Sequence, residues 1–153
     1  MPEEIRRLNI GCSPEAAVSG PILVQSNFSA TLIFNAMKQV EGAYQAAGLA
    51  VVSFKACSIT KFGYPNDEAW SAIPRTSGLS YDFYEVLNSS WNDELDQLNR
   101  HGFPRHQRTK QRHFLALFHD SSFECLAQHL SVELTHEPLA NVLSRLNQGL
   151  LTE

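Results

Sequence analysis

Apolar and polar residues alternate along several short stretches of this chain, which is the pattern of half-buried β-strands. The clearest example lies between His113 and Leu134, where two alternating arms flank the polar tetrad at 119–122. We interpret this stretch as a β-hairpin with its turn at Asp120-Ser121. One shared face of the hairpin is then predicted to enter the core, with Cys125 buried and inert. The expected pairs are Phe118 with Phe123, Ala116 with Cys125, and Phe114 with Ala127.

Three other segments, 22–26, 49–61 and 81–87, carry strand patterns, and residues 69–78 are predicted to form a surface loop. The segment 28–47 fits two patterns. Apolar residues recur at helical spacing, yet residues 30–36 alternate, and Gly42 would weaken a helix. We favour a strand over 30–36 and leave 38–47 open between strand and helix.

Two helices are predicted from apolar spacing and end signals. The first runs over 90–100, where Ser90 and Asp93 resemble a capping box and Gly102 with Pro104 ends the helix. The second covers 135–151, with leucines at helical spacing. Strands without alternating strand–helix units favour antiparallel pairing. The predicted fold is therefore α+β, a mainly antiparallel sheet shaped as a sandwich or half-barrel, with a mid-chain and a C-terminal helix.

Length and composition limit the range of architectures and partners. A chain of 153 residues suits one globular domain, predicted over 21–153 after a loosely held arm at 1–20. The net charge of −4 argues against bulk attraction to nucleic acid or an anionic membrane. No apolar run approaches the ~20 residues of a membrane helix. Three widely spaced cysteines fit a reducing compartment, so a cytoplasmic location is expected.

The hairpin tip carries the first candidate chemistry. His119, Asp120 and Glu124 supply an imidazole and two carboxylates, enough for a general acid/base pair or a mononuclear metal site. No matched ligand spacing supports a metal, and the sequence leaves the cofactor unknown. The alternative is that Asp120 forms the turn while His119 and Glu124 face water.

A second candidate is the loop containing Tyr64, Asn66, Asp67 and Glu68. Its adjacent carboxylates follow a Pro-Asn turn and could bind a cation or a polar ligand through oxygen. The alternative is a loop that satisfies its own hydrogen bonds, with Asn66 capping a short turn.

The segment 100–113 holds five basic residues and no acid, which could contact phosphates. Phe103 is its only aromatic residue, so a stacking platform for single strands is thin and nucleic acid is an unfavoured partner. A solvated connector is the preferred interpretation. Glycine-rich phosphate-binding loops and the Gly-x-Ser-x-Gly elbow are absent from the sequence.

Three motifs resemble those of a group of small bacterial proteins of unknown function. They are Phe62-Gly63-Tyr64-Pro65-Asn66-Asp67-Glu68, the segment 84–91 (YEVLNSSW), and the segment 118–125 (FHDSSFEC). The resemblance covers residues 50–127, about half of the chain, and implies no activity.

Three hypotheses follow for function. The first is a binding module that presents Tyr64–Glu68 beside the hairpin tip to a small polar ligand or a protein partner. The second is an enzyme, either metal-assisted or acid/base, that uses His119, Asp120 and Glu124 with Asp67 or Glu68. The third is a nucleic-acid accessory protein that uses Arg105–Arg112. The enzyme hypothesis requires the two carboxylate clusters to converge.

Overall fold

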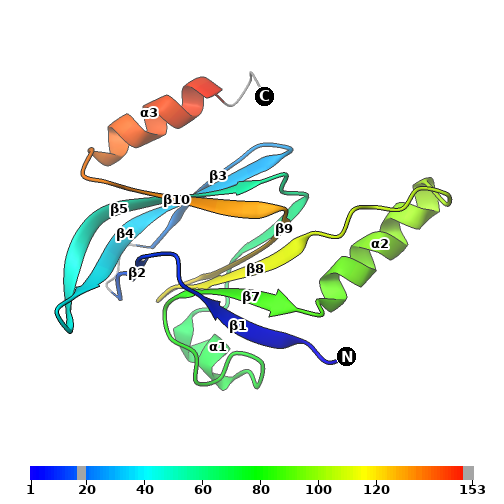
Figure 1. The fold of residues 1–153 in the computed structure, drawn as a ribbon, viewed down its shortest axis with the longest axis horizontal. Helices are drawn as coiled ribbons and strands as arrows, with labels where there is room; N and C mark the ends of the chain where they lie inside the picture. Colours follow the sequence, from blue (N-terminus) through cyan, green and yellow to red (C-terminus); the bar gives the residue numbers. More distant parts are fainter. Residues whose placement is uncertain (17–19, 150–153) are drawn as a thin grey trace.

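The computed structural model describes residues 1–16 and 20–149, in which two antiparallel sheets pack face to face (Figure 1). The first sheet has the strand order β1-β7-β8-β9-β6. Its strands are β1 (Glu4–Leu8), β7 (Phe83–Leu87), β8 (Arg112–Leu117), β9 (Ser122–Ala127) and β6 (Ile59–Gly63). The second sheet follows the order β10-β5-β4-β2, and β3 also pairs with β4. Its strands are β10 (His129–Thr135), β5 (Ala43–Lys55), β4 (Ser29–Val40), β2 (Ser13–Pro14) and β3 (Ile22–Gln25).

The core lies between the two sheets and is rich in phenylalanine. Phe54 of the second sheet contacts Phe114 and Phe123 of the first, with ring centroids 5.5 and 5.1 Å apart. Small residues such as Ala116 and Ala127 are fully buried in the same cluster as these rings, so the core combines large and small side chains. The predicted α+β fold with a mainly antiparallel sheet is confirmed, in its sandwich form.

One short helix and the C-terminal helix lie on the outer surfaces of the sandwich, and the mid-chain helix projects from its side (Figure 1). Helix α1 (Asp67–Ala72) places Trp70 against Leu115 and Leu117 on the outside of the first sheet. Helix α3 (Leu139–Gly149) buries Val142 against the second sheet. Helix α2 (Ser90–Gly102) leaves the end of β7 and extends to one side of the sandwich. None of the helices among the described residues has the length and apolar character to cross a membrane.

The ambiguous segment 28–47 forms strand throughout most of its length. Strands β4 and β5 pair as a long hairpin, joined at Glu41-Gly42. Both turn residues have positive φ, 51° and 81°, which suits a two-residue hairpin turn and makes Gly42 favourable there. Of the apolar residues at helical spacing, Ile33 packs under α3 on the outer face of this hairpin, whereas Val40 and Tyr44 are exposed near its turn.

Several boundaries differ from the prediction. Trp70 lies in α1 rather than in a loop, because Asn66 caps a short helix. The second hairpin arm stops at Ala127, and β10 crosses to the other sheet, so the predicted C-terminal helix begins at Leu139. Its predicted last residues, 150 and 151, lie outside the described part. Within the predicted arm 1–20, β1 pairs with β7 and β2 with β4, so both belong to the sheets.

Candidate functional site

The turn of the hairpin lies one residue earlier in the chain than predicted. Ala116 lies opposite Phe123 and Phe114 opposite Cys125, and the backbone N–H of Phe118 donates to the Ser121 carbonyl. The predicted register was therefore wrong by a shift of two residues. Side chains repeat every two residues along a strand, so this shift left every side chain on its predicted face. Cys125 is fully buried, as predicted, and burial raises the pKa of its thiol well above the ordinary value.

The loop at 64–68 reaches this hairpin tip. The backbone N–H of Asp67 donates to the His119 carbonyl at 2.9 Å, and the Trp70 indole N–H donates to the Phe118 carbonyl at 3.2 Å. The Asn66 side chain accepts from the Ala69 N–H and caps α1. Two of the sequence-predicted clusters are thus neighbours, joined through backbone groups.

The side chains at this tip largely satisfy one another. The Tyr81 hydroxyl donates to Asp67 Oδ2 at 2.6 Å, and His119 Nδ1 lies 2.8 Å from Asp120 Oδ1. Nε2 of His119 is 3.8 Å from Asp67 Oδ2. The hydrogen bond from Tyr81 lowers the pKa of Asp67, and the same bond raises the pKa of Tyr81 to about 12. The hydrogen bond to Asp120, with Asp67 nearby, raises the pKa of His119.

Glu124 belongs to a different cluster. The observed register places it opposite Leu115, diagonal to His113 rather than to His119. Its Oε1 lies 2.8 Å from His113 Nε2 and accepts a hydrogen bond from Arg75 at 2.8 Å. The three residues proposed for catalysis from sequence are therefore split, with His119 and Asp120 at the tip and Glu124 along the sheet.

A buried hydrogen-bonded chain continues from Glu124 through His113 to Ser89. Ser89 Oγ lies 2.7 Å from His113 Nδ1. Ser89 is also the N-cap of α2 and accepts from the Asn92 N–H, one residue before the predicted cap at Ser90. His113 is 3% exposed and packs against the Trp91 ring at 5.2 Å.

The charge of Glu124 is held in place by its neighbours. Burial would raise its pKa, but hydrogen bonds from His113 and Arg75 outweigh burial and lower the pKa to about 2. Arg75 also lies 3.5 Å from Glu3, which accepts hydrogen bonds from the backbone N–H and Oγ of Ser90. The N-terminal residues are thereby attached to the start of α2.

Sequence reasoning missed Ser89, His113 and Arg75. One available signal was His113 itself, which occupies an outer-face position in line with Leu115 and Leu117 and diagonal to a carboxylate. The sequence around Ser89 indicated only the start of a helix, and Arg75 lay in a predicted surface loop. Their contact depends on β7, β8 and β9 lying side by side.

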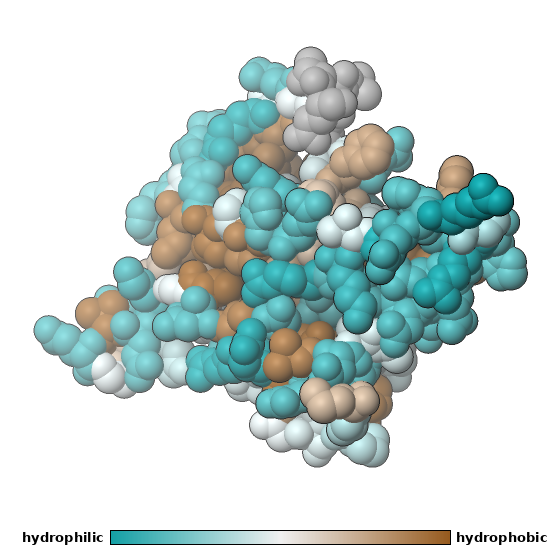
Figure 2. All heavy atoms as spheres, turned by 45° about the vertical axis from the view of Figure 1, so that its right-hand side comes forward, coloured by the Kyte–Doolittle hydropathy of each residue, from teal (hydrophilic) through white to brown (hydrophobic). Residues whose placement is uncertain are grey.

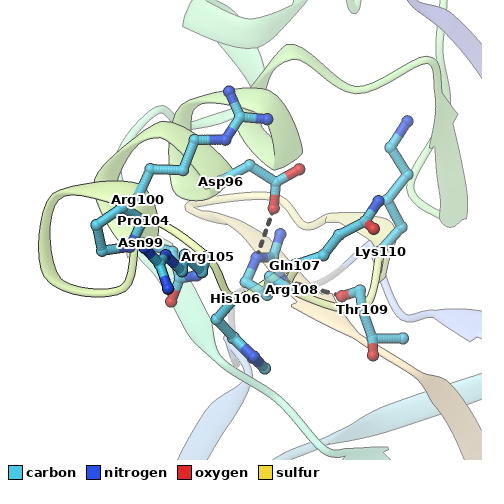
Figure 3. Close-up of a pocket in the computed structure, with 10 residues that line it drawn as sticks. All are labelled: Asp96, Asn99, Arg100, Pro104, Arg105, His106, Gln107, Arg108, Thr109 and Lys110. Carbon is cyan, nitrogen blue, oxygen red and sulfur yellow. Dashed lines mark hydrogen bonds and ion pairs between the residues drawn. The ribbon is translucent and has the colours of Figure 1, made fainter.

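The basic segment borders a cavity of about 670 Å³, here called the connector cleft and drawn in Figure 3. It lies between the later turns of α2 and residues 103–111, which lead to β8 and are called the connector. Its lining residues are Asp96, Asn99, Arg100, Pro104, Arg105, His106, Gln107, Arg108, Thr109 and Lys110. Hydrophilic residues also cover most of the right-hand side of the surface in Figure 2.

The connector is tied down through Arg108. Its guanidinium pairs with Asp96 at 2.9 Å and donates to the side chains of Asn92 and Gln111 at 2.8 and 2.7 Å. The contact with Asp96 is dashed in Figure 3, where Arg105 and Lys110 lie on either side of it. The connector is therefore hydrogen-bonded to α2 rather than only solvated.

A second cavity of about 410 Å³, here called the Ser89 cleft, opens beside the start of α2. Ser89 and His113 line it together with Asn92, Lys110 and Arg112. Lys110 borders both clefts. Across residues 1–16 and 20–149, no group of three or more His, Cys, Asp or Glu side chains is arranged to hold a metal ion.

Comparison with protein-family models, with curated proteins and with solved structures gives no match. The resemblance to a group of small bacterial proteins thus stays a prediction, and function is argued from the chemistry of these sites.

Proposed function

We propose that this protein is a binding module for a small anionic ligand, which it holds in the connector cleft. The observation that carries the proposal is the charge of this cleft. Arg100, Arg105 and Lys110 line one cavity, and no ion pair is recorded for any of them within the described residues. Cations with hydrogen-bonding capacity that line one cavity are suited to phosphate, sulfate or carboxylate groups.

The one acidic side chain in the lining does not cancel this charge. Asp96 is paired with Arg108, so that pair is neutral overall. The remaining three cations, with His106 beside them, leave the cleft positive in a chain of net charge −4. A cavity of about 670 Å³ also lies in the usual size range of small-molecule sites.

A small ligand is favoured over nucleic acid. The overall negative charge of the chain opposes long-range attraction of a polyanion. Phe103 is 63% exposed and packs edge-on against His106. Binding of a single strand uses several aromatic rings on which successive bases stack, and Phe103 supplies one.

The hairpin tip is the weaker ligand site. Asn66 caps α1, and Asp67 accepts a hydrogen bond from Tyr81, so these two polar side chains of the loop form hydrogen bonds within the protein. Tyr64 is 82% exposed and Glu68 is also exposed. These two side chains could still contact a partner.

The proposal is tested by titrating the protein with tripolyphosphate at low salt in a calorimeter. Saturable binding is expected, together with a rise in melting temperature. The triple variant Arg100→Gln, Arg105→Gln, Lys110→Gln is expected to lose affinity by about 100-fold or more, because each charge-assisted hydrogen bond contributes more than 1 kcal/mol.

A matched control removes the same number of positive charges elsewhere, with Lys38→Gln, Lys55→Gln and Arg145→Gln. This control is expected to bind almost as well as the wild type. Equal loss in both triple variants, or the absence of saturable binding, would contradict the proposal. Tighter binding of a short single-stranded oligonucleotide than of tripolyphosphate would instead favour the nucleic-acid hypothesis.

A further inference from the structure

Ser89, His113 and Glu124 come from three neighbouring elements on one side of the first sheet. Ser89 follows β7 and caps α2, while His113 on β8 is paired with Val86 on β7. Glu124 lies on β9, the next strand. Their polar atoms form a continuous line, with Ser89 Oγ 2.7 Å from His113 Nδ1 and His113 Nε2 2.8 Å from Glu124 Oε1.

The direction of the protons along this line follows from the charge of Glu124. A carboxylate with a pKa of about 2 is ionised at neutral pH and accepts hydrogen bonds only. A neutral His113 therefore carries its proton on Nε2, facing Glu124. Its Nδ1 then has a free lone pair, and the Ser89 hydroxyl donates to it.

This order of groups is that of an activated nucleophile. A hydroxyl bonded to an imidazole, which is oriented in turn by a carboxylate, can lose its proton as the oxygen attacks an electrophile. In the serine-protease template the hydroxyl faces Nε2. Here the two ring nitrogens exchange roles, and the same sequence of donors and acceptors is kept.

The surroundings hold His113 in this orientation. The Trp91 ring packs edge-on against the imidazole at 5.2 Å, and the Arg75 guanidinium donates to the same carboxylate oxygen, Glu124 Oε1. Ser89 stands at the N-terminal end of α2, a helix of 13 residues whose dipole favours negative charge there. The Ser90 N–H at this end of the helix already donates to the Glu3 carboxylate.

The pair Ser89 and His113 is in contact with a cavity rather than enclosed on all sides. Both line the Ser89 cleft of about 410 Å³. Arg112 and Glu85 in its wall pair with each other at 2.8 Å, whereas no ion pair is recorded for Lys110 within the described part of the chain. The cleft is thus polar and large enough for a small substrate.

We propose that Ser89 is the nucleophile of an acyl-transfer site, with His113 as its general base and Glu124 as the positioning residue of the imidazole. The substrate class is a small carboxylic ester. This site is centred on other residues than the connector cleft, although Lys110 lines both cavities.

The reaction requires no cofactor for its balance. Ser89 Oγ forms a bond to the acyl carbon as its proton moves to His113 Nδ1, and the bond between that carbon and the alcohol oxygen breaks. The departing alcohol takes the proton from Nδ1. A water molecule then gives a proton to Nδ1 and its hydroxyl to the acyl carbon, and Ser89 leaves with the proton restored.

The first test treats the full-length protein with a fluorophosphonate probe and locates the modified residue by peptide mass spectrometry. Modification of Ser89 is expected, because such probes react with activated serine hydroxyls. Ser122→Ala, on β9 at the same side of the sheet, serves as a control and is expected to leave the labelling unchanged. Absence of labelling at Ser89 would overturn the proposal.

The second test measures hydrolysis of p-nitrophenyl acetate. Ser89→Asn retains a good helix cap but has no nucleophilic hydroxyl, so it separates catalysis from capping. With an unchanged far-UV circular dichroism spectrum, it is expected to lose at least about 100-fold in kcat/KM. Glu124→Gln is expected to lower kcat while KM changes little, since Glu124 acts through His113. A folded Ser89→Asn variant with the wild-type rate would overturn the assignment.

Discussion

Two histidine–carboxylate pairs in this protein have the same separation and opposite surroundings. His119 and Asp120 lie 2.8 Å apart at the hairpin tip, with side chains 41% and 57% exposed. His113 and Glu124 are also 2.8 Å apart, with side chains 3% and 17% exposed. The first pair is adjacent in sequence, and the second is separated by a whole hairpin.

The difference shows that the contribution of a short contact between titratable groups to the free energy of unfolding depends on its burial. Water screens an exposed pair, and holding two mobile side chains together costs entropy, so such pairs contribute little. A buried pair has lost its hydration, so the removal of one partner leaves the other unsatisfied. The tip pair was visible in the sequence, yet the buried pair has the larger expected effects.

The largest effect is expected for Glu124→Gln. The pKa of Glu124 is lowered from 4.5 to about 2 by His113 and Arg75 against the opposing effect of burial, which corresponds to about 3 kcal/mol at neutral pH. Urea unfolding at pH 7 should show a loss of this order. Asp120→Asn, the matching change at the tip, should leave the unfolding midpoint almost unchanged. Equal effects of the two substitutions would remove the contrast between the pairs.

The second prediction concerns acid. The folded-state pKa of Glu124 lies below its unfolded value, so its contribution is fully present above about pH 4.5 and is lost as the pH falls toward about 2. Urea midpoints measured at intervals between pH 5 and pH 2.5 should fall more steeply for the wild type than for Glu124→Gln. Parallel curves would show that Glu124 is not the group responsible.

A smaller loss is expected for Trp70→Phe, which tests how the tip is attached to α1. The indole N–H donates to the buried Phe118 carbonyl, and this substitution leaves that carbonyl without its donor. The expected loss is about 1–2 kcal/mol in the free energy of unfolding, measured with urea.

Trp91→Phe is the control for this measurement, because no indole hydrogen bond is recorded for Trp91 in the described residues. It should cost less than Trp70→Phe. A larger loss for Trp91→Phe would indicate that ring packing, rather than the hydrogen bond, dominates at both tryptophans.

The smallest effect is a titration shift at the tip itself. The hydrogen bond to Asp120, with Asp67 close by, raises the pKa of His119 above 6.5. Any stabilisation from this pair is present below pH 6.5 and is lost as the pH rises through the raised folded-state pKa. An NMR titration of the imidazole signals should show the raised value, and Asp120→Asn should lower it. An unchanged titration in that variant would assign the shift to Asp67 instead.

Local pattern predicted the elements of this fold more completely than their pairing. The alternation over 113–127 identified both strands and their buried face, since both depend on a period of two residues. It left the register open by two residues, because such a shift exposes no apolar side chain. Residue 128 marks a boundary that the pattern did not show, where the chain leaves one sheet for the other.

The candidate sites divide in the same way. Asp67 and His119 were expected to meet if the loop reached the tip, and they do so through a backbone hydrogen bond. The line from Ser89 to Glu124 could not be derived from spacing, since it requires three strands in a particular lateral order. The connector cleft could be predicted in part. The run of basic residues was evident in the sequence, whereas the ion pair of Arg108 with Asp96, which attaches the connector to α2, was not.

The sequence by itself determined the α+β class, the buried faces of the strands and the two longer helices. These features follow from residue periodicity and from helix end signals, both of which involve residues close together in the chain. Only the tertiary structure decided which histidine is buried beside which carboxylate. That choice depends on strand order and register, which are set by packing between residues distant in the chain. His119 is adjacent to its partner, whereas His113 acquires Ser89 and Glu124 only when β7, β8 and β9 assemble into one sheet.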